Sequence, residues 1–380
     1  MKRPIYMDYA ATTPCDHRVV EKMLPYFTQE FGNASSNDHS YGWLAKEAVD
    51  EARRQIAELI HAKTQDIIFT SGATEAINLA LKGILTGQKA SKKHVITNKA
   101  EHSAVLDTCD YLSENGCEIT YVDVDSDGII HLDQLQKAMK ENTALIAIQY
   151  ANNETGVIQP IKEIATIAGQ HQIPFFCDAT QAVGKIPVDV TADNIDLLAF
   201  SSHKIYGPKG VGALYVNADL RKKLNAQQHG GKQELGKRSG TLNVAGIVGF
   251  GEAARLCKAE MESFAKEIIT YRNMIEKELA AALPEIQING KNAKRLPHIL
   301  NFFVPGINAE QLLLKLSSKL AMSRGSACSS AQRIPSHVLT AMHLGETVAH
   351  DAIRLSMGRM TTKDEVAQTL VVLLHELNSK

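Results

Sequence analysis

The feature of this sequence that most constrains its fold is the alternation of short apolar runs with longer amphipathic runs between residues 66 and 216. Short apolar runs bounded by turn residues fit strands that are buried on both faces, and the runs between them fit helices. Strands that alternate with helices favour a mainly parallel sheet covered on both faces. The sequence therefore predicts an α/β fold, with strands at residues 94–97, 118–124, 145–150, 174–177, 197–200 and 211–216.

The predicted strand at residues 197–200 leads directly into Ser201, His203 and Lys204, before a Gly-Pro pair breaks the regular structure. A lysine that is buried near other cations has a lowered pKa, so its amine can form a Schiff base with a carbonyl cofactor. Ser201 and His203 are residue types that can hold a phosphate beside it. Taken alone, this segment fits a solvated loop better, so the interpretation depends on the other strand ends.

A second candidate for phosphate binding lies where a strand pattern changes to a helix pattern across Ser71 and Gly72. The first N–H groups of the new helix, from Ala73 and Thr74, lack intrahelical partners, and the positive end of the helix dipole favours an anion. The alternative that Thr74 only caps the helix is equally good for this segment by itself.

Polar residues follow the other predicted strands as well, and ligands gather at the carboxyl ends of parallel strands. A pyridine ring that carries a phosphate could use each of them. Asp178 would keep the ring nitrogen protonated, and His102 would stack on the ring. Asn153 and Gln181 would donate hydrogen bonds to its phenolic oxygen. Any one of these residues fits a structural role, whereas the joint arrangement favours a cofactor site.

The 380 residues carry 41 Lys and Arg against 42 Asp and Glu, which predicts no general affinity for nucleic acid or for an anionic membrane. No stretch approaches the ~20 apolar residues of a membrane span, and the first residues do not resemble a signal peptide, so we expect a cytoplasmic protein. The six cysteines are scattered without metal-ligand spacing, which predicts free thiols in a reducing compartment and no metal site.

The length of the chain predicts two structural units. A helical pattern over residues 247–283 ends at Pro284 and leads into a strand at 299–304, a helix at 310–320, a strand at 352–357 and a terminal helix. We therefore expect a large domain at residues 16–249 and a smaller domain formed by residues 1–15 and 250–380.

The motifs together resemble the cysteine desulfurases of the NifS/IscS type, which depend on pyridoxal phosphate (PLP) and belong to the class V aminotransferase superfamily. The resemblance covers nearly the whole chain. The matching motifs are Ser71-Gly72-Ala73-Thr74-Glu75, Glu101-His102, Asn152-Asn153-Glu154-x-Gly156, Asp178-x-x-Gln181, Ser201-x-His203-Lys204, Arg238-Ser239-Gly240-Thr241, Ser326-Ala327-Cys328 and Ile353-Arg354-Leu355-Ser356. The resemblance implies a fold-type I transferase, with a mainly parallel sheet of the seven-stranded type and a smaller α+β domain.

The resemblance also implies a role for each matching residue. Lys204 would hold PLP and then move the Cα proton of L-cysteine, while His102 would stack on the ring and handle substrate protons. Asp178 would pair with the pyridinium nitrogen. Asn153 and Gln181 would contact the ring oxygen. The phosphate would be held by Ala73, Thr74, Ser201 and His203, together with Thr241 from the other subunit of a homodimer. Arg354 would bind the substrate carboxylate, with Asn33 nearby.

Cys328 is the residue that would make this protein a desulfurase. It lies among Ser, Gly and Ala residues, a poor environment for burying a thiol. Its thiolate would attack the sulfur of bound cysteine, release alanine and carry a persulfide to an acceptor for iron–sulfur cluster assembly or tRNA thiolation. The alternatives are a selenocysteine lyase, another class V aminotransferase, or a non-catalytic protein that only binds PLP or carries a persulfide.

Overall fold

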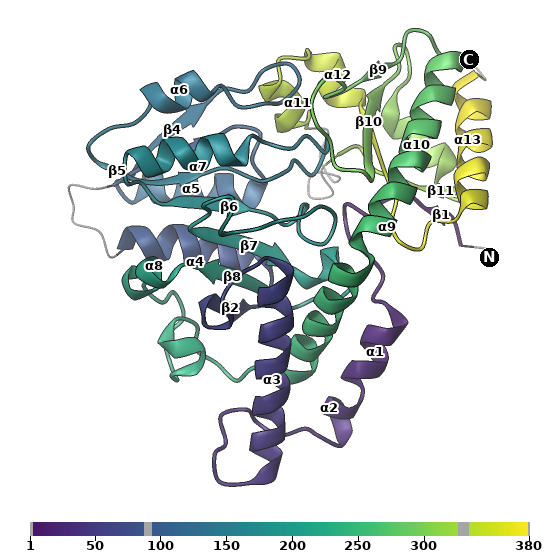
Figure 1. Ribbon diagram of the computed structural model, residues 1–380. Helices are drawn as coiled ribbons and strands as arrows, with labels where there is room; N and C mark the ends of the chain where they lie inside the picture. The colour runs from purple at the N-terminus through teal and green to yellow at the C-terminus, as the bar shows by residue number, and fades with distance from the viewer. Residues whose placement is uncertain (1–2, 87–92, 326–333, 379–380) are drawn as a thin grey trace.

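The computed structural model describes residues 3–86, 93–325 and 334–378, so Ser326, Ala327 and Cys328 of the predicted site lie outside the described residues. A seven-stranded sheet organises the chain, in the order β2-β8-β7-β6-β5-β3-β4 (Figure 1). Its strands are β2 (Ile67–Thr70), β3 (His94–Asn98), β4 (Glu118–Val122), β5 (Thr143–Ala147), β6 (Phe175–Asp178), β7 (Leu197–Ser201) and β8 (Gly212–Val216). Only β8 runs against its neighbours, which confirms the mainly parallel sheet.

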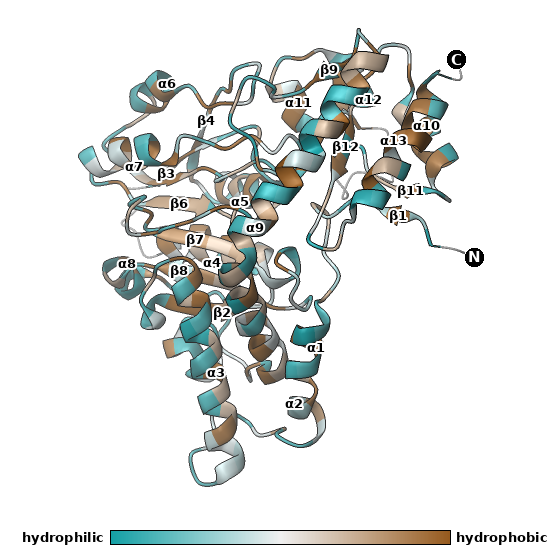
Figure 2. Cartoon of the chain, turned by 45° about the vertical axis from the view of Figure 1, so that its right-hand side comes forward, coloured by the Kyte–Doolittle hydropathy of each residue, from teal (hydrophilic) through white to brown (hydrophobic). Residues whose placement is uncertain are grey.

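Helices cover both faces of this sheet. The helices up to residue 282 are α1 (His17–Met23), α2 (Pro25–Thr28), α3 (Ser40–Leu59), α4 (Ala73–Thr86), α5 (Ser103–Glu114), α6 (Leu132–Lys137), α7 (Ile161–Gln170), α8 (Ala218–Lys223) and α9 (Val244–Ala282). The shorter α1 and α2 pack on α9 instead of on the sheet (Figure 1). Side chains of α3, α7 and α9 pack with one face of the sheet, and those of α4, α5 and α8 pack with the other. The strands are apolar because both faces are buried, whereas α3 alternates apolar and polar residues (Figure 2).

A smaller unit lies beyond the far end of α9. It contains β1 (Ile5–Tyr6), β9 (Gln287–Ile288), β10 (Ile299–Phe303), α10 (Ala309–Leu316), β11 (Leu320–Ala321), α11 (His337–Ala341), α12 (Glu346–Asp351), β12 (Ile353–Ser356) and α13 (Lys363–Asn378). The strands β12, β10 and β9 form an antiparallel sheet. A separate hydrophobic cluster, which includes Phe264, Leu300 and Leu373, packs this sheet against α9 and α13. The expected boundary at residue 249 falls inside α9, and the division into two domains stays a prediction.

The N-terminal residues 5–13 connect the two units, and we call them the N-terminal arm. Its strand β1 pairs with β11, and the amide of Ala10 donates to Ser356 Oγ of β12 over 2.9 Å. Further along, the amide of Thr13 donates to the carbonyl of His203 over 3.0 Å. The arm therefore runs from the small sheet to the carboxyl end of β7, where the predicted site lies.

Several elements differ slightly from the sequence expectation. The strand expected at 145–150 is β5 at Thr143–Ala147, because residues 149–152 turn away to make hydrogen bonds of their own, such as Gln149 Nε2 to the carbonyl of Ala100. The terminal helix α13 is preceded by a capping box, in which Thr362 Oγ1 accepts from the amide of Glu365 and Glu365 Oε2 accepts from the amide of Thr362. No helix within the described ranges is long and apolar enough to cross a membrane.

Candidate active site

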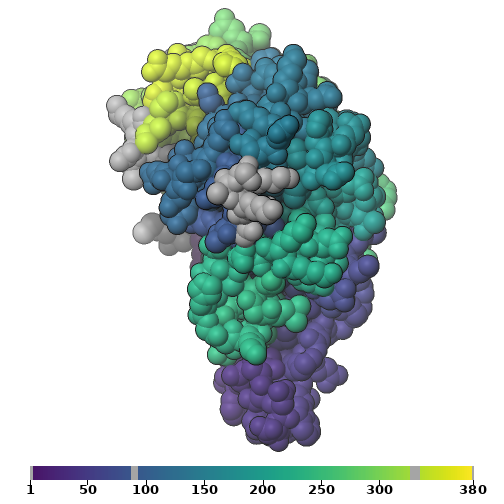
Figure 3. All heavy atoms as spheres, turned by 90° about the vertical axis from the view of Figure 1, so that its left-hand side faces the viewer, coloured from purple at the N-terminus to yellow at the C-terminus, as the bar shows by residue number. Residues whose placement is uncertain are grey.

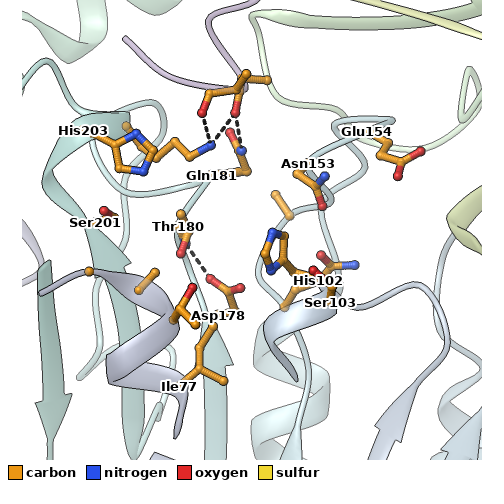
Figure 4. A pocket seen from close by; sticks show the side chains of 18 of the residues that line it. Ile77, His102, Ser103, Asn153, Glu154, Asp178, Thr180, Gln181, Ser201 and His203 are labelled. Carbon is orange, nitrogen blue, oxygen red and sulfur yellow. Dashed lines mark hydrogen bonds between the residues drawn. The ribbon is translucent and has the colours of Figure 1, made fainter. Parts of the chain in front are cut away.

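The carboxyl ends of the parallel strands open into a cavity of about 910 Å³. Strands β6 and β7 deliver Asp178 and Ser201, and the turns after β3 and β5 deliver His102 and Asn153 (Figure 4). The predicted residues that line this cavity are Ala73, Thr74, His102, Asn153, Asp178, Gln181, Ser201, His203, Lys204 and Arg354. The cavity is within the roughly 300–1,000 Å³ range of small-molecule sites. Residues from the whole length of the chain thus meet at the carboxyl edge of the sheet, where the sequence predicts a ligand site.

Lys204 ends a short 3₁₀ turn, Ser202–Lys204, that follows β7. Its Nζ donates to the carbonyl of Ala10 over 2.5 Å and to that of Ala11 over 2.7 Å. Both acceptors belong to the N-terminal arm, and Gln181 Nε2 donates to the same Ala10 carbonyl over 3.0 Å. The arm therefore fixes the amine at the wall of the cavity.

Tyr206 holds the turn that presents Lys204. Its backbone is left-handed, with φ of 67°, which is unfavourable for a bulky residue. Its amide donates to Thr13 Oγ1 over 2.9 Å, and its hydroxyl accepts from the amide of Arg359 over 2.6 Å. The ring also contacts two cations, with Lys185 Nζ 4.4 Å and the Arg359 guanidinium 4.3 Å from its centroid. These contacts offset the backbone strain.

Lys185 is a buried lysine without a hydrogen-bond partner among the described residues. Its Nζ lies 4.4 Å from the ring centroid of Tyr206 and 5.6 Å from that of Phe264, and burial lowers the pKa of Lys185 to about 7. The sequence analysis did not single out this residue.

The N-terminus of α4 and the end of β7 form one side of the cavity. The first N–H groups of α4 point along the helix axis toward it. Gly212 allows the turn before α4 to lie against β8, because a Cβ at this position would be 2.6 Å from the Cα of Gly72. Ser201 and His203 complete this side, and His203 Nδ1 is 3.0 Å from Thr12 Oγ1 of the arm.

His203 is a neutral imidazole at pH 7. Burial, together with the charges of Lys204 and Lys209, lowers the pKa of His203 to about 4. It can therefore act at this side as a hydrogen-bonding group without adding charge.

His102 and Asp178 face each other across the centre of the cavity (Figure 4). His102 is the N-cap of α5, and its Nδ1 accepts from the amide of Ala104 over 3.1 Å, which places the proton of the neutral ring on Nε2. Burial lowers the pKa of His102, and Lys204 acts in the same direction while Asp178 opposes it. Asp178 is buried, and its Oδ1 accepts from the amide of Thr180. A neutral imidazole and a carboxylate thus flank the same space.

Arg354 reaches the cavity from β12 of the small unit and is only 2% exposed. Its Nη1 donates to the carbonyl of Asn153 over 2.9 Å, and its Nη2 pairs with Asp8 Oδ1 over 2.7 Å. Asp8 also accepts from Ser323 Oγ over 3.1 Å. Arg354 Nε has no hydrogen-bond partner among the described residues. The guanidinium is therefore held in one orientation with a donor left for an anion.

Two predicted residues, Asn33 and Thr241, are not brought to this cavity. Asn33 is exposed, near the tip formed by α2 and the start of α3, where its Oδ1 accepts from the amide of Ser35. Thr241 is exposed after a loop that Arg238 ties to Glu75 by an ion pair of 2.8 Å. Cys328 lies outside the described residues.

The sequence analysis missed four contributors: Asp8, the carbonyls of Ala10 and Ala11, and Glu154. Backbone carbonyls carry no signal in residue type, and the segment around Asp8 fits an ordinary extended arm. Glu154 stood inside a quoted motif without a role. Its position directly after Asn153 was the one signal that could have found it.

The cavity fits the cofactor that the resemblance implies. The hydroxyl of Thr180 lies on its wall, buried and without a hydrogen-bond partner among the described residues, so a polar ligand can use it. The N-terminus of α4, with Thr74, Ser201 and His203, provides donors for a phosphate, and Asp178 provides a carboxylate for a protonated ring nitrogen. Lys204 supplies the amine that would attach the cofactor.

Comparisons with known proteins identify the family of the chain. A family model described as aminotransferase class-V matches residues 5–369. The cysteine desulfurase IscS of Anaeromyxobacter sp. (strain Fw109-5) is 47% identical over 377 residues, which are 99% of this chain and 93% of the relative. The cysteine desulfurase IscS of Neisseria meningitidis (strain FAM18) is 49% identical over 366 residues, which are 96% of this chain and 90% of the relative.

Two solved structures are similar as well. A NifS-like protein superposes with a TM-score of 0.92 at 35% identity, over 99% of both chains. A structure titled SspA in complex with cysteine superposes with a TM-score of 0.82 at 36% identity, over 94% of this chain and 99% of the other.

Proposed function

The chain belongs to the aminotransferase class-V family and is a PLP-dependent cysteine desulfurase, and on this premise we propose a role for each residue of the cavity. The observation that carries the proposal is the meeting of an amine, Lys204, and a carboxylate-binding guanidinium, Arg354, on the walls of one cavity. An amino-acid substrate needs both groups, because its α-amino group must reach the cofactor while its carboxylate is held.

The residues on the sheet side would bind and orient the cofactor. Ala73, Thr74, Ser201 and His203 would hold the phosphate, and Asn153 and Gln181 would contact the ring oxygen. Asp178 would keep the ring nitrogen protonated. When bound, PLP supplies an electron sink that stabilises negative charge at the substrate Cα.

The other residues would act on the substrate. Arg354 would bind its carboxylate. Lys204 Nζ, once displaced by the substrate amine, would take the Cα proton, and the carbonyls of Ala10 and Ala11 would hold the resulting ammonium in place. His102 would carry a proton at Nε2, facing the substrate thiol.

We propose that Cys328 completes the reaction. Its thiolate would form a bond to the substrate sulfur while the Cβ–S bond breaks, and the electron pair left on Cβ would take a proton to give alanine. Support for this role comes from the resemblance and from the desulfurase relatives. The persulfide would then pass to an acceptor protein for iron–sulfur cluster assembly or tRNA thiolation.

A single-turnover reaction of the holoenzyme with L-cysteine tests this proposal. We expect one alanine per site and a gain of about 32 Da, one sulfur atom, on the tryptic peptide that carries Cys328. Cys328→Ala should keep the cofactor and lose the sulfur, whereas the matched control Cys15→Ala should keep both. Alanine with free sulfide and no sulfur on that peptide would instead identify a lyase.

We also propose that the enzyme is a homodimer in which Thr241 of one copy completes the phosphate site of the other. The chain exposes apolar side chains at a tip that protrudes from the body (Figure 3). They include Leu24, Phe27, Phe31, Tyr41, Trp43 and Leu44. Such a cluster supports a protein interface. The exposed positions of Thr241 and Asn33 in their own chain support contributions across that interface.

Analytical ultracentrifugation of the wild type and of Phe27→Glu/Trp43→Glu tests the dimer. We expect the double variant to sediment as a monomer and to bind PLP more weakly. Retention of the dimer by this variant would place the interface elsewhere.

The five described cysteines are free thiols, which supports a reducing, cytoplasmic location.

A further inference from the structure

A second imidazole, that of His337, lines the cavity and has no part in the proposed function. His337 is half-buried at the first position of α11. The next two residues, Val338 and Leu339, are buried in the hydrophobic cluster that also contains Cys177 of β6 and Leu198 of β7. The His337 ring is therefore carried by a helix that packs on the large unit, close to the strands that deliver the site.

The ring of His337 contacts the chain just before His102. Its Nε2 lies 2.9 Å from the carbonyl oxygen of Glu101. A carbonyl oxygen can only accept a hydrogen bond, so His337 Nε2 carries a proton and donates it. Glu101 directly precedes His102, and its carbonyl belongs to the peptide that links the two residues. His337 thus holds the backbone from which the His102 side chain projects.

The connection between β3 and α5 is held by side chains from other segments. The Ala100 carbonyl accepts from Gln149 Nε2 over 2.7 Å and from Asn152 Nδ2 over 3.0 Å. Both of these donors follow β5, whereas the donor to the Glu101 carbonyl comes from α11. The last peptide before His102 is therefore tied to a different part of the chain from the peptide before it.

The position of this peptide affects which nitrogen of His102 carries the proton. His102 Nδ1 accepts from the amide of Ala104 over 3.1 Å, which leaves the proton of the neutral ring on Nε2. Burial lowers the pKa of His102, so the ring is neutral at pH 8. A shift of the Glu101–His102 peptide would weaken the contact at Nδ1 and let the proton occupy that nitrogen instead.

We propose that His337 is a positioning residue for His102, because its hydrogen bond to the Glu101 carbonyl fixes the peptide that keeps the His102 proton on Nε2. This inference rests on the proposed role of His102 in handling substrate protons. Loss of the hydrogen bond should lower kcat and leave KM unchanged, since His337 has no assigned contact with the substrate carboxylate. Glutamine can place an amide N–H where His337 Nε2 lies, whereas phenylalanine keeps a ring without a donor.

The first test is NMR of the holoenzyme labelled with ¹⁵N-histidine, at pH 8. The signals of His102 are identified by their absence from His102→Gln. In His337→Phe the fraction of His102 that is protonated on Nδ1 should rise at least about threefold, and in His337→Gln it should stay within about twofold of the wild type. The control is His171→Phe, which replaces an exposed histidine after α7 and should leave this fraction unchanged.

A double-mutant cycle tests whether His337 acts through His102. In a single turnover with L-cysteine, alanine formation should slow roughly tenfold in His337→Phe and recover to within about twofold of the wild type in His337→Gln. When His102→Gln is already present, His337→Phe should have no further effect, because the group that it positions has been removed.

An unchanged protonation pattern of His102 in His337→Phe would overturn the proposal, and so would additive losses in the cycle. A loss of rate in His337→Gln as large as in His337→Phe would overturn it too, because the donor would then not be the part that matters. If His337→Phe does not fold, His337→Leu, which also lacks a donor, takes its place. If His102→Gln forms alanine at the wild-type rate, the proposed role of His102 fails, while the NMR measurement still tests His337.

Discussion

The side of the cavity next to β7 and α4 is built from neighbouring strand ends, whereas the side around Arg354 is built from contacts between distant segments. On the sheet side, Asp178 and Ser201 leave adjacent parallel strands, so the sheet alone brings them together. On the arm side, Arg354 is fixed by Asp8, which is 346 residues away in the sequence. The sheet side therefore depends on secondary structure, and the arm side depends on how the N-terminal arm docks.

This difference predicts two kinds of failure. Changes on the sheet side should affect the cofactor and every later step. Changes on the arm side should affect substrate binding while the cofactor stays in place. Lys204 and His203 touch both sides, because each contacts a residue of the arm.

The largest effect is expected for Lys204→Ala. Loss of the attaching amine should lower kcat by ~10³-fold or more, because the same group also moves the Cα proton. The visible absorbance of the covalently attached cofactor should disappear. The control is Lys222→Ala, which replaces an exposed lysine of α8 and should keep both the wild-type kcat and the cofactor absorbance. A Lys204→Ala enzyme with unchanged absorbance would contradict the assignment.

Arg354→Ala should lower kcat/KM by about 100-fold, mostly through KM. Loss of a buried charged hydrogen-bonding partner costs roughly 3 kcal/mol. The cofactor absorbance should stay, which distinguishes the arm side from the sheet side. Arg354→Lys keeps the charge but not the planar fork, so it should recover only part of the affinity. An unchanged KM would show that another group binds the carboxylate.

Asp8→Ala should raise KM by about tenfold with little change in kcat. It removes the acceptor of Arg354 Nη2, so the guanidinium is oriented less well for the substrate carboxylate. A loss of about 1.4 kcal/mol in binding free energy corresponds to a tenfold loss of affinity. Ser323→Ala, which removes only a hydrogen bond to Asp8, should have a smaller effect in the same direction. A fall in KM would mean that Asp8 competes with the substrate for Arg354.

The smallest effect concerns pH and His203. Burial lowers its pKa in the folded protein to about 4, whereas the unfolded chain titrates near 6.5. Its contribution to stability is therefore complete above about pH 6.5 and is lost as the pH falls toward 4. Between pH 7 and pH 5 the free energy of unfolding should fall less in His203→Gln than in the wild type. We expect the two decreases to differ by up to about 1 kcal/mol after solvent screening. Urea unfolding at both values measures this, and equal losses would contradict it.

The sheet side was largely predictable from the sequence. Short apolar runs located β3, β6 and β7, and strand ends in a parallel sheet must share one edge, so Asp178, Ser201 and Lys204 had to lie close together. The role of Arg354 came from the resemblance, and the structure places it in the same cavity.

The arm side was not predictable in the same way. Asp8 pairs with Arg354 only through tertiary docking of the arm, and no local pattern encodes a contact over 346 residues. The carbonyls that hold Lys204 have no side-chain signature at all. The resemblance assigned Asn33 to the substrate and Thr241 to the phosphate, but both side chains are exposed away from the cavity of their own chain, so these two assignments stay predictions.

The docking of the N-terminal arm on β12 also sets an order of events during protein synthesis. Asp8 and Ala10 leave the ribosome early, but their partners Arg354 and Ser356 are among the later residues to be translated. The large sheet can form while synthesis continues, whereas the cavity cannot be closed until β12 has emerged. Assembly of the cavity therefore depends on contacts that span most of the chain, and non-local contacts of this kind form slowly during folding.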